Sequence, residues 1–106
     1  MKFEWDSRKA QQNLLDHEIS FEEATTVFAD PLAGTIPDPD HSSGEARFLT
    51  IGLISNGRLI VVSHIEEGDT IRIISARQAT THERKQYESQ APSTRSKPDE
   101  TRIRLL

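Results

Sequence analysis

Two arginines in one predicted β-strand are the residues of this chain whose type and spacing best suit chemistry. Arg72 and Arg77 belong to residues 70–77, TIRIISAR. A guanidinium group stays charged and presents a fork of N–H donors that matches a phosphate group. The two side chains could therefore bind phosphate, or they could lie along the surface and pair with Glu83 or Glu88. The strict alternation of a strand predicts that they point to opposite faces of the sheet.

Arg47 and His64 extend the set of residues that could take part in catalysis. Arg47 lies close behind Glu45 in the predicted strand 46–54. Arg47 could form an exposed cross-strand ion pair, or it could be a third phosphate-binding cation. His64 ends the predicted strand 58–65. Histidine is the usual general acid or base near neutral pH, but one histidine at a strand end is also typical of a half-buried structural residue.

One loop of the sequence offers a metal site as an alternative reading. Residues 38–41, Asp-Pro-Asp-His, hold two carboxylates and an imidazole. No similar ligand set occurs elsewhere and the prolines stiffen the loop, so the sequence favours neither a metal nor a cofactor. Because the chain has no cysteine, disulfides, thiolate zinc sites and a cysteine nucleophile are excluded.

The chain that must position these residues has the size of one domain, 106 residues. Only 34% of the residues are hydrophobic, but they occur in dense runs, which is typical of a folded chain. The net charge is −4, and an acidic total argues against tight binding of nucleic acid through phosphate charge alone. The acidic residues are concentrated in residues 1–30, whereas residues 91–106 carry four basic and two acidic side chains.

The sequence shows no targeting or membrane segment. The N-terminal residues MKFEWDSRK lack the apolar stretch of a signal peptide. The longest apolar runs have about five residues, far short of the ~20 of a membrane span. We therefore expect a cytoplasmic protein without a membrane partner.

Local signals predict a strand and two helices in the first thirty residues. Residues 1–5 read as a short strand with its two aromatic side chains on one face. Asp6 caps a helix over about residues 7–17. The apolar stripe of this helix is predicted to comprise Ala10, Leu14 and His17, with Leu15 beside it. The capping box at residues 20–23, Ser-Phe-Glu-Glu, opens a second helix that continues to about residue 29.

An antiparallel meander is predicted to follow. Residues 30–45 are rich in proline and form a loop, with an irregular edge strand over Leu32 to Ile36. Three strands are then expected, joined by tight turns at Asn56-Gly57 and at residues 66–69. Their ranges are 46–54, 58–65 and 70–77.

One more helix completes the predicted α+β fold. A second capping box, Thr80 to Glu83, opens a helix over about residues 81–90 that carries Arg84 and Tyr87 on one side. Two N-terminal helices would cover one face of the sheet and leave the other face partly open. We expect residues 1–90 to form the domain and residues 91–106 to be a flexible or partner-binding tail.

The whole set of motifs resembles the BrnT-type toxins of bacterial BrnT–BrnA type II toxin–antitoxin modules. It covers about residues 1–90 and is most specific in FEWD near the start together with IRIISAR near the end. The matching residues are Phe3-Glu4-Trp5-Asp6, Lys9, Asn13, His17, Ile19 to Ala24, Val27 to Pro31, Glu45, Arg47, Ile51-Gly52, Val61 to His64, Ile71 to Arg77, Ala79-Thr80, Glu83-Arg84 and Tyr87.

The resemblance implies a compact RelE-like fold and a ribonuclease activity, formally a hydrolase, that inhibits translation. It also implies neutralisation by a BrnA-type antitoxin with a ribbon-helix-helix part. DNA would then be bound only through the antitoxin. The assembly would be a homodimer or a toxin–antitoxin heterotetramer.

Resemblance and residue chemistry together predict metal-independent cleavage of RNA, by attack of a 2′-hydroxyl on the adjacent phosphate. Such a step needs a base, cations that stabilise the transition state, and an acid. Arg72 and Arg77 would hold the phosphate, with Arg47 as a third contact. The candidates for the remaining roles are His64 or Glu45 as the base, Tyr87 or His64 as the acid, and Lys9 and Arg84 as further substrate contacts.

Two departures from the family keep other functions open. The chain is acidic where such toxins tend to be basic, and residues from about 91 onward extend past the usual end. A non-catalytic module that serves as antitoxin partner and co-repressor is therefore the alternative. A metal-dependent nuclease built on residues 38–41 is the third candidate.

Overall fold

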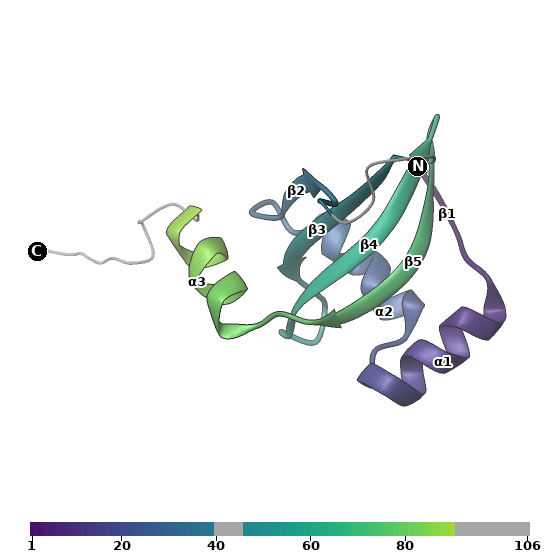
Figure 1. Ribbon diagram of the computed structural model, residues 1–106, viewed down its shortest axis with the longest axis horizontal. Coiled ribbons are helices and arrows are strands. Elements are labelled where there is room, and N and C mark those ends of the chain that lie inside the picture. Colours follow the sequence, from purple (N-terminus) through teal and green to yellow (C-terminus); the bar gives the residue numbers. More distant parts are fainter. Residues whose placement is uncertain (40–45, 91–106) are drawn as a thin grey trace, which may run out of the picture.

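A five-stranded sheet forms the centre of this protein, whose computed structural model describes residues 1–39 and 46–90 (Figure 1). The strands are β1 (Lys2–Glu4), β2 (Gly34–Pro37), β3 (Arg47–Leu53), β4 (Leu59–Glu67) and β5 (Thr70–Gln78). Their order across the sheet is β1-β5-β4-β3-β2. The helices are α1 (Ser7–His17), α2 (Phe21–Thr25), the 3₁₀-helix η1 (Thr26–Ala29) and α3 (Thr81–Gln90). The α+β class expected from the sequence is confirmed.

The predicted meander is present as β3, β4 and β5, each antiparallel to the next. The first turn closes with a hydrogen bond of 3.0 Å from the N–H of Ile54 to the carbonyl of Arg58. Gly57 takes the left-handed conformation there, with φ of 87°, while Asn56 does not. A three-residue loop that ends in a left-handed glycine suits the twist of a hairpin.

The two edge strands differ from the sequence-based expectation. β1 lies parallel to β5, with Phe3 opposite Ile71, so the sheet is mixed rather than purely antiparallel. This pairing joins residues almost seventy positions apart, so no local sequence pattern can predict it. At the other edge β2 is antiparallel to β3 and spans Gly34–Pro37, a shift from the predicted Leu32–Ile36. Pro37 is tolerated there because an edge strand can spare a backbone donor.

The helices α1 and α2 and the segment η1 cover one face of the sheet, as predicted. Figure 1 shows α2 behind the strands. The second helix is shorter than predicted, because α2 ends at Thr25 and η1 continues the turn. The core between the layers consists of Ile19, Phe21, Ala24, Val27, Ile54, Ile60, Val62, Ile71, Ile73 and Ala76, with Phe3, Trp5, Ala10 and Phe28 packed against it.

Gly52 permits the close approach of η1 to β3. A Cβ atom at this position would lie 3.0 Å from Val27 Cγ2, from Ala33 Cβ and from Asp30 Oδ2. These distances are too short for ordinary contact, so any larger residue would push η1 away from the sheet.

The predicted apolar stripe of α1 is correct at Ala10, which packs against the core, but wrong at Leu14, Leu15 and His17, which are exposed. Leu14 and Leu15 are 50% and 78% exposed, whereas Asn13 is buried. The Asn13 side chain donates to the carbonyls of Ala76 (2.9 Å) and Ile19 (3.0 Å) and accepts from the N–H of Ala76 (3.0 Å). β1 pairs with β5 only as far as Arg72, so Asn13 satisfies a part of that edge which no strand covers.

A register shift in β5 corrects the predicted alternation of residues 70–77. Ser63 lies opposite Ser75, but the next residue, His64, lies opposite Ile73. Ile74 therefore has no partner, and the side chains on either side of it change face. The consequence is that Arg72 and Arg77 lie on the same face of the sheet rather than on opposite faces.

Candidate active site

The face of the sheet opposite α1 and α2, here called the open face, collects three arginines. Arg47 and Arg72 both lie opposite Ile65 of the central strand β4, so the three residues form one row across the sheet. Arg77 lies opposite Val61, further along the same face. Ile65 and Val61 belong to this face because their neighbours in β4, Val62 and Ile60, are in the core on the other side.

Arg72 is held by an exposed ion pair. Its Nη1 lies 3.1 Å from Oε2 of Glu4, which is its neighbour in the parallel strand β1. Both side chains are close to half exposed. Exposed pairs of this kind contribute about 0–1 kcal/mol, so a phosphate group could replace the carboxylate at low cost.

Arg77 is held more firmly, in a two-point pair with Glu83 of α3. Its Nη1 and Nη2 donate to the two carboxylate oxygens of Glu83 over 2.8 and 2.9 Å. The hydrogen bonds from Arg77, with help from the Thr80 N–H, lower the pKa of Glu83 to about 2, and the same pair raises the pKa of Arg77. The pairing with Glu83 expected as the structural alternative for Arg77 is therefore present. The Thr80–Glu83 capping box forms as well, with Glu83 N–H donating to Thr80 Oγ1.

His64 does not reach the open face. Its imidazole is fully buried in the helix-covered core, with ring contacts to Phe28 and Phe48 at centroid distances of 5.0 and 6.0 Å. Nε2 lies 2.7 Å from Oγ1 of Thr50. Burial lowers the pKa of His64, although the nearby Glu66 carboxylate opposes the shift. In this arrangement the imidazole has no surface with which to touch an RNA phosphate on the open face.

Tyr87 anchors α3 to Asp30, the residue that follows η1. The residue is only 7% exposed, and its hydroxyl donates to Oδ2 of Asp30 over 2.7 Å. Asp30 also accepts from the N–H groups of Leu32 and Leu53. The carboxylate therefore joins three elements, and the tyrosine hydroxyl is committed to this joint. Arg84, predicted on the same side of α3 as Tyr87, is exposed.

The other predicted site residues are spread over different parts of the molecule. Lys9 is exposed on α1, which lies in the helical layer and not on the open face. Glu45 lies outside the described residues, and so do Asp40 and His41 of the proposed metal loop. Within residues 1–39 and 46–90, no group of three or more metal-ligating side chains is found.

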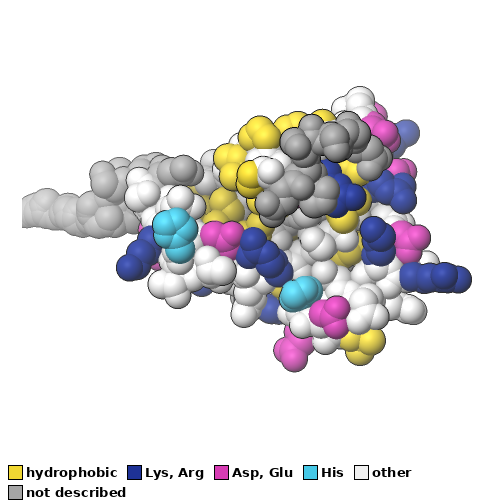
Figure 2. All heavy atoms as spheres, in the orientation of Figure 1, with side chains coloured by type: hydrophobic (Ala, Val, Ile, Leu, Met, Phe, Trp, Pro, Cys, Tyr) yellow, Lys and Arg dark blue, Asp and Glu magenta, His cyan; other side chains and the backbone are white. Residues whose placement is uncertain are grey.

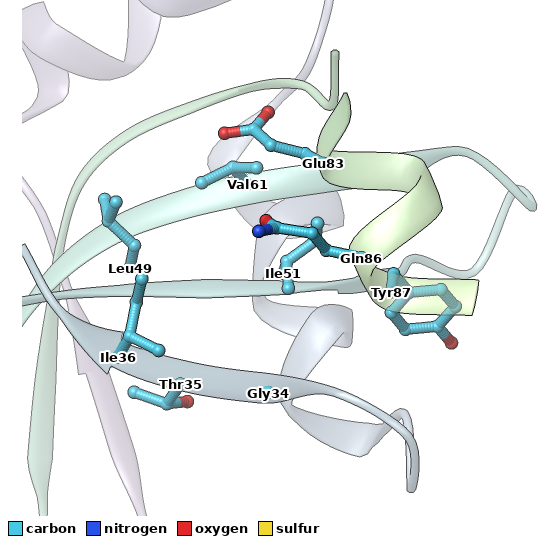
Figure 3. Close-up of a pocket in the computed structure, with 9 residues that line it drawn as sticks. All are labelled: Gly34, Thr35, Ile36, Leu49, Ile51, Val61, Glu83, Gln86 and Tyr87. Carbon is cyan, nitrogen blue, oxygen red and sulfur yellow. The ribbon is translucent and has the colours of Figure 1, made fainter. Parts of the chain in front are cut away.

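A pocket of about 230 Å³ opens between α3 and the β2 side of the open face (Figure 3). Ile36, Leu49, Ile51 and Val61 give it apolar walls. Glu83, Gln86 and Tyr87 line it from α3, and Figure 3 shows the Gln86 side chain extending toward the strands.

The molecular surface carries mixed charge. Figure 2 shows Lys and Arg side chains interspersed with Asp and Glu on the side in view, rather than one uniform basic patch. In the part of the chain that the structure describes, no helix is both long and apolar enough to cross a membrane.

Sequence reasoning missed two residues that shape the site. Asn13 holds α1 against β5 beside Arg77, and Asp30 ties η1 to β3 and α3. Asn13 directly precedes the two leucines of its helix, and Asp30 directly follows Ala29. A polar residue in that setting is a signal for a buried hydrogen bond. The long-range partners are 63 residues away for Asn13 (Ala76) and 57 residues away for Asp30 (Tyr87), so no local pattern identifies them.

Comparisons with known proteins found a matching family and a similar fold. A family model described as the ribonuclease toxin BrnT of type II toxin–antitoxin systems matches residues 5–83. The crystal structure of the Brucella abortus ribonuclease toxin BrnT is similar, with a TM-score of 0.61 and 25% sequence identity. That match covers 76% of this chain and 99% of the Brucella chain. A search of curated proteins found no match.

Proposed function

This chain belongs to the family of BrnT ribonuclease toxins of type II toxin–antitoxin systems, and on that premise we propose how it acts. It is a metal-independent endoribonuclease of the cytoplasm that cleaves RNA and so inhibits translation. A BrnA-type ribbon-helix-helix antitoxin neutralises it, and DNA is bound only through that antitoxin. The observation that carries the proposal is the placement of Arg47, Arg72 and Arg77 on the open face.

The proposed reaction uses the RNA's own 2′-hydroxyl as nucleophile. The 2′-oxygen bonds to the adjacent phosphorus and loses its proton to a base, while the bond to the 5′-oxygen breaks and that oxygen takes up a proton from water. The products are a 2′,3′-cyclic phosphate and a 5′-hydroxyl. Negative charge grows on the phosphate in the transition state, and fixed guanidinium groups stabilise it there.

The arginines contribute unequally to this step. Arg72 releases Glu4 and turns to the phosphate, because its exposed pair is weak. Arg77 keeps its two-point pair with Glu83 and so offers a preset cation of lower net charge. Arg47 completes the row from β3.

The base is proposed from the residues that remain, while water supplies the proton for the leaving oxygen. Glu45 precedes Arg47 by two positions and stays the proposed base. Glu83 is a poor base, because a pKa of about 2 leaves its carboxylate with little affinity for a proton. His64 acts from the core, and Tyr87 through its bond to Asp30, so we assign both to the scaffold of the site.

A second candidate function is favoured by the ion pairs themselves. Arg72 and Arg77 both face carboxylates, and the net charge of the chain is −4. A non-catalytic antitoxin partner and co-repressor would have the same features. Growth arrest on expression without the antitoxin separates the two, since only a ribonuclease stops growth by itself.

The deciding experiment is cleavage of a structured RNA by the purified protein in EDTA. We expect the wild type to produce 2′,3′-cyclic phosphate ends. Arg72→Ala should lower the rate about 10²–10³-fold, the usual loss when a transition-state cation is removed. Arg8→Ala, an exposed arginine of α1 in the helical layer, is the matched control and should cleave like the wild type.

Arg77→Ala tests the second cation but also cuts a tether of α3, so its thermal unfolding must be measured beside its rate. A folded, inactive variant supports the proposal. Cleavage that persists in Arg72→Ala and Arg77→Ala at the wild-type rate would contradict it. An inactive wild type that still binds an antitoxin would favour the second candidate.

A further inference from the structure

We propose that the pocket between α3 and the strands β2, β3 and β4 holds one unpaired nucleobase of the RNA. This inference rests on the proposed function and adds a base-reading subsite to it. The pocket lies on the open face, beside the arginines but distinct from them.

The pocket has the size and surface that a single flat base needs. Its volume of about 230 Å³ is below the roughly 300–1,000 Å³ of sites for drug-sized ligands, which suits one ring system better than a whole nucleotide or a protein helix. Leu49, Ile51 and Val61 supply apolar contact from the strands. Unstacked bases are bound by placing their faces against such surfaces.

Gln86 supplies the polar group that a base edge requires. Its amide extends from α3 toward the strands (Figure 3) and carries both a donor and an acceptor. An amide side chain can make two hydrogen bonds to one base edge and so distinguish bases. Glu83 also lines the pocket, but its carboxylate is already bound to Arg77.

The pocket adjoins a cation that would hold the neighbouring phosphate. Val61 of the pocket lies directly opposite Arg77 in the sheet, and directly opposed side chains have Cβ atoms about 5 Å apart. Glu83 links the two sites, because it lines the pocket and binds Arg77. A nucleotide can therefore place its phosphate at Arg77 and its base in the pocket.

The walls are held in place before any ligand arrives. The pair of Arg77 with Glu83 fixes the first turn of α3, and the bond from Tyr87 to Asp30 fixes the next turn. A preformed site costs little ordering on binding, so even one base can add measurable affinity.

The test is binding of short strands that cannot be cleaved. Five-residue single strands without 2′-hydroxyl groups, each with one base type, are compared with an abasic strand of equal charge. Fluorescence anisotropy on the full chain gives the affinity, and methyl NMR of Ile51 and Val61 reports on the pocket. We expect at least one base type to bind about tenfold more tightly than the abasic strand and to shift both methyl signals.

Two variants show whether the pocket causes the difference. Gln86→Leu should lose the preference between bases and bind the abasic strand like the wild type. Gln11→Leu makes the same chemical change on the exposed surface of α1 and should behave like the wild type throughout. Both positions are exposed, so neither change threatens the fold.

The outcomes separate this inference from the function on which it rests. Equal affinity for all strands with unshifted methyl signals would overturn the base site, while RNA cleavage in EDTA would leave the ribonuclease intact. No binding of any strand and no cleavage would remove both. NMR contacts of the Ile51 and Val61 methyls with Leu105 in the free full chain would assign the pocket to the chain's own end and overturn the inference.

Discussion

At the scale of single residues, the imidazole of His64 shows how the fold changes what a titratable group can do. The side chain is enclosed by Phe28, Phe48 and Thr50 and is fully buried. Its Nδ1 is buried without a hydrogen bond, with Glu66 Oε2 at 3.5 Å. Burial disfavours the charged form of such a group, and the carboxylate of Glu66 opposes this only in part.

We therefore expect the folded protein to lose stability in mild acid, because of His64. Its pKa is lowered in the folded protein from a usual value of 6.5, so below that pH the unfolded chain binds the proton more readily. The free energy of unfolding should fall as the pH drops below 6.5, by at most about 1.4 kcal/mol per pH unit. Urea unfolding at pH 7.5, 6.5 and 5.5 measures this.

The matched variants for that experiment are His64→Gln and His17→Gln. His64→Gln should flatten the pH dependence, because glutamine does not titrate. His17→Gln makes the same change at an exposed position at the end of α1 and is the matched control. An unchanged slope in His64→Gln would show that other groups cause the acid sensitivity.

At the scale of elements, α1 is attached to the sheet mainly through an amide. Asn13 replaces the strand that β5 lacks beyond Arg72, and it bonds both backbone groups of Ala76. The leucines that a helical pattern would place inward lie on the surface instead. The backbone of β5 beside Arg77 is thus held by a side chain from the opposite layer.

Asn13→Ala should consequently destabilise the protein far more than removal of an apolar residue from α1. The change leaves the N–H and carbonyl of Ala76 and the carbonyl of Ile19 without their partner, which we expect to cost about 2–4 kcal/mol. Leu15→Ala, at a position that is 78% exposed, should change the free energy of unfolding by less than about 0.5 kcal/mol. Denaturant unfolding compares them, and equal effects would contradict this role of Asn13.

At the scale of the whole molecule, α3 is a lid fixed over one end of the open face by two joints. One joins Glu83 to Arg77 of the neighbouring strand, and the other joins Tyr87 to Asp30, far away in sequence. Because α3 forms one wall of the pocket, these two joints help to set the shape of the pocket. The stability of this docking thus controls the shape of the proposed RNA site.

The Glu83 joint predicts an acid-sensitive position of α3. The pKa of Glu83 is lowered from 4.5 to about 2 in the folded state, so its stabilisation is complete above pH 4.5 and is lost as the pH falls toward 2. Because Arg77 is 39% exposed, solvent screening reduces the effect to about 1 kcal/mol. The protection factors for amide hydrogen exchange in α3, which correct for the intrinsic pH dependence of exchange, should fall over that range.

Glu83→Gln provides the comparison for α3. Its protection factors in α3 should already be lower than those of the wild type at pH 7, and they should change less between pH 4.5 and 2. Glu88→Gln, an exposed position on the same helix, should follow the wild type. Identical exchange in the wild type and Glu83→Gln at pH 7 would show that the Arg77 pair does not hold α3.

Much of the local structure of this protein is determined by the sequence alone. Asp6, Ser20 and Thr80 start their helices where their side chains can accept from the backbone two or three residues ahead. Runs of apolar residues predict the strands β3, β4 and β5, and the glycine at position 57 predicts the turn between the first two of them. These signals depend only on neighbouring residues, so they can be recognised in the sequence without knowing the fold. The motifs that indicate the BrnT family are likewise present in the sequence.

Only the tertiary structure decided which of these residues meet. The register shift at Ile74 brings Arg72 and Arg77 to one face, β1 supplies Glu4 beside Arg72, and α3 supplies Glu83 beside Arg77. The burial of His64 and the inward position of Asn13 also depend on contacts between distant segments. The physical reason is that the face, burial and pairing of a side chain are set by packing across the whole chain, whereas the sequence pattern reports only the preference of each short segment.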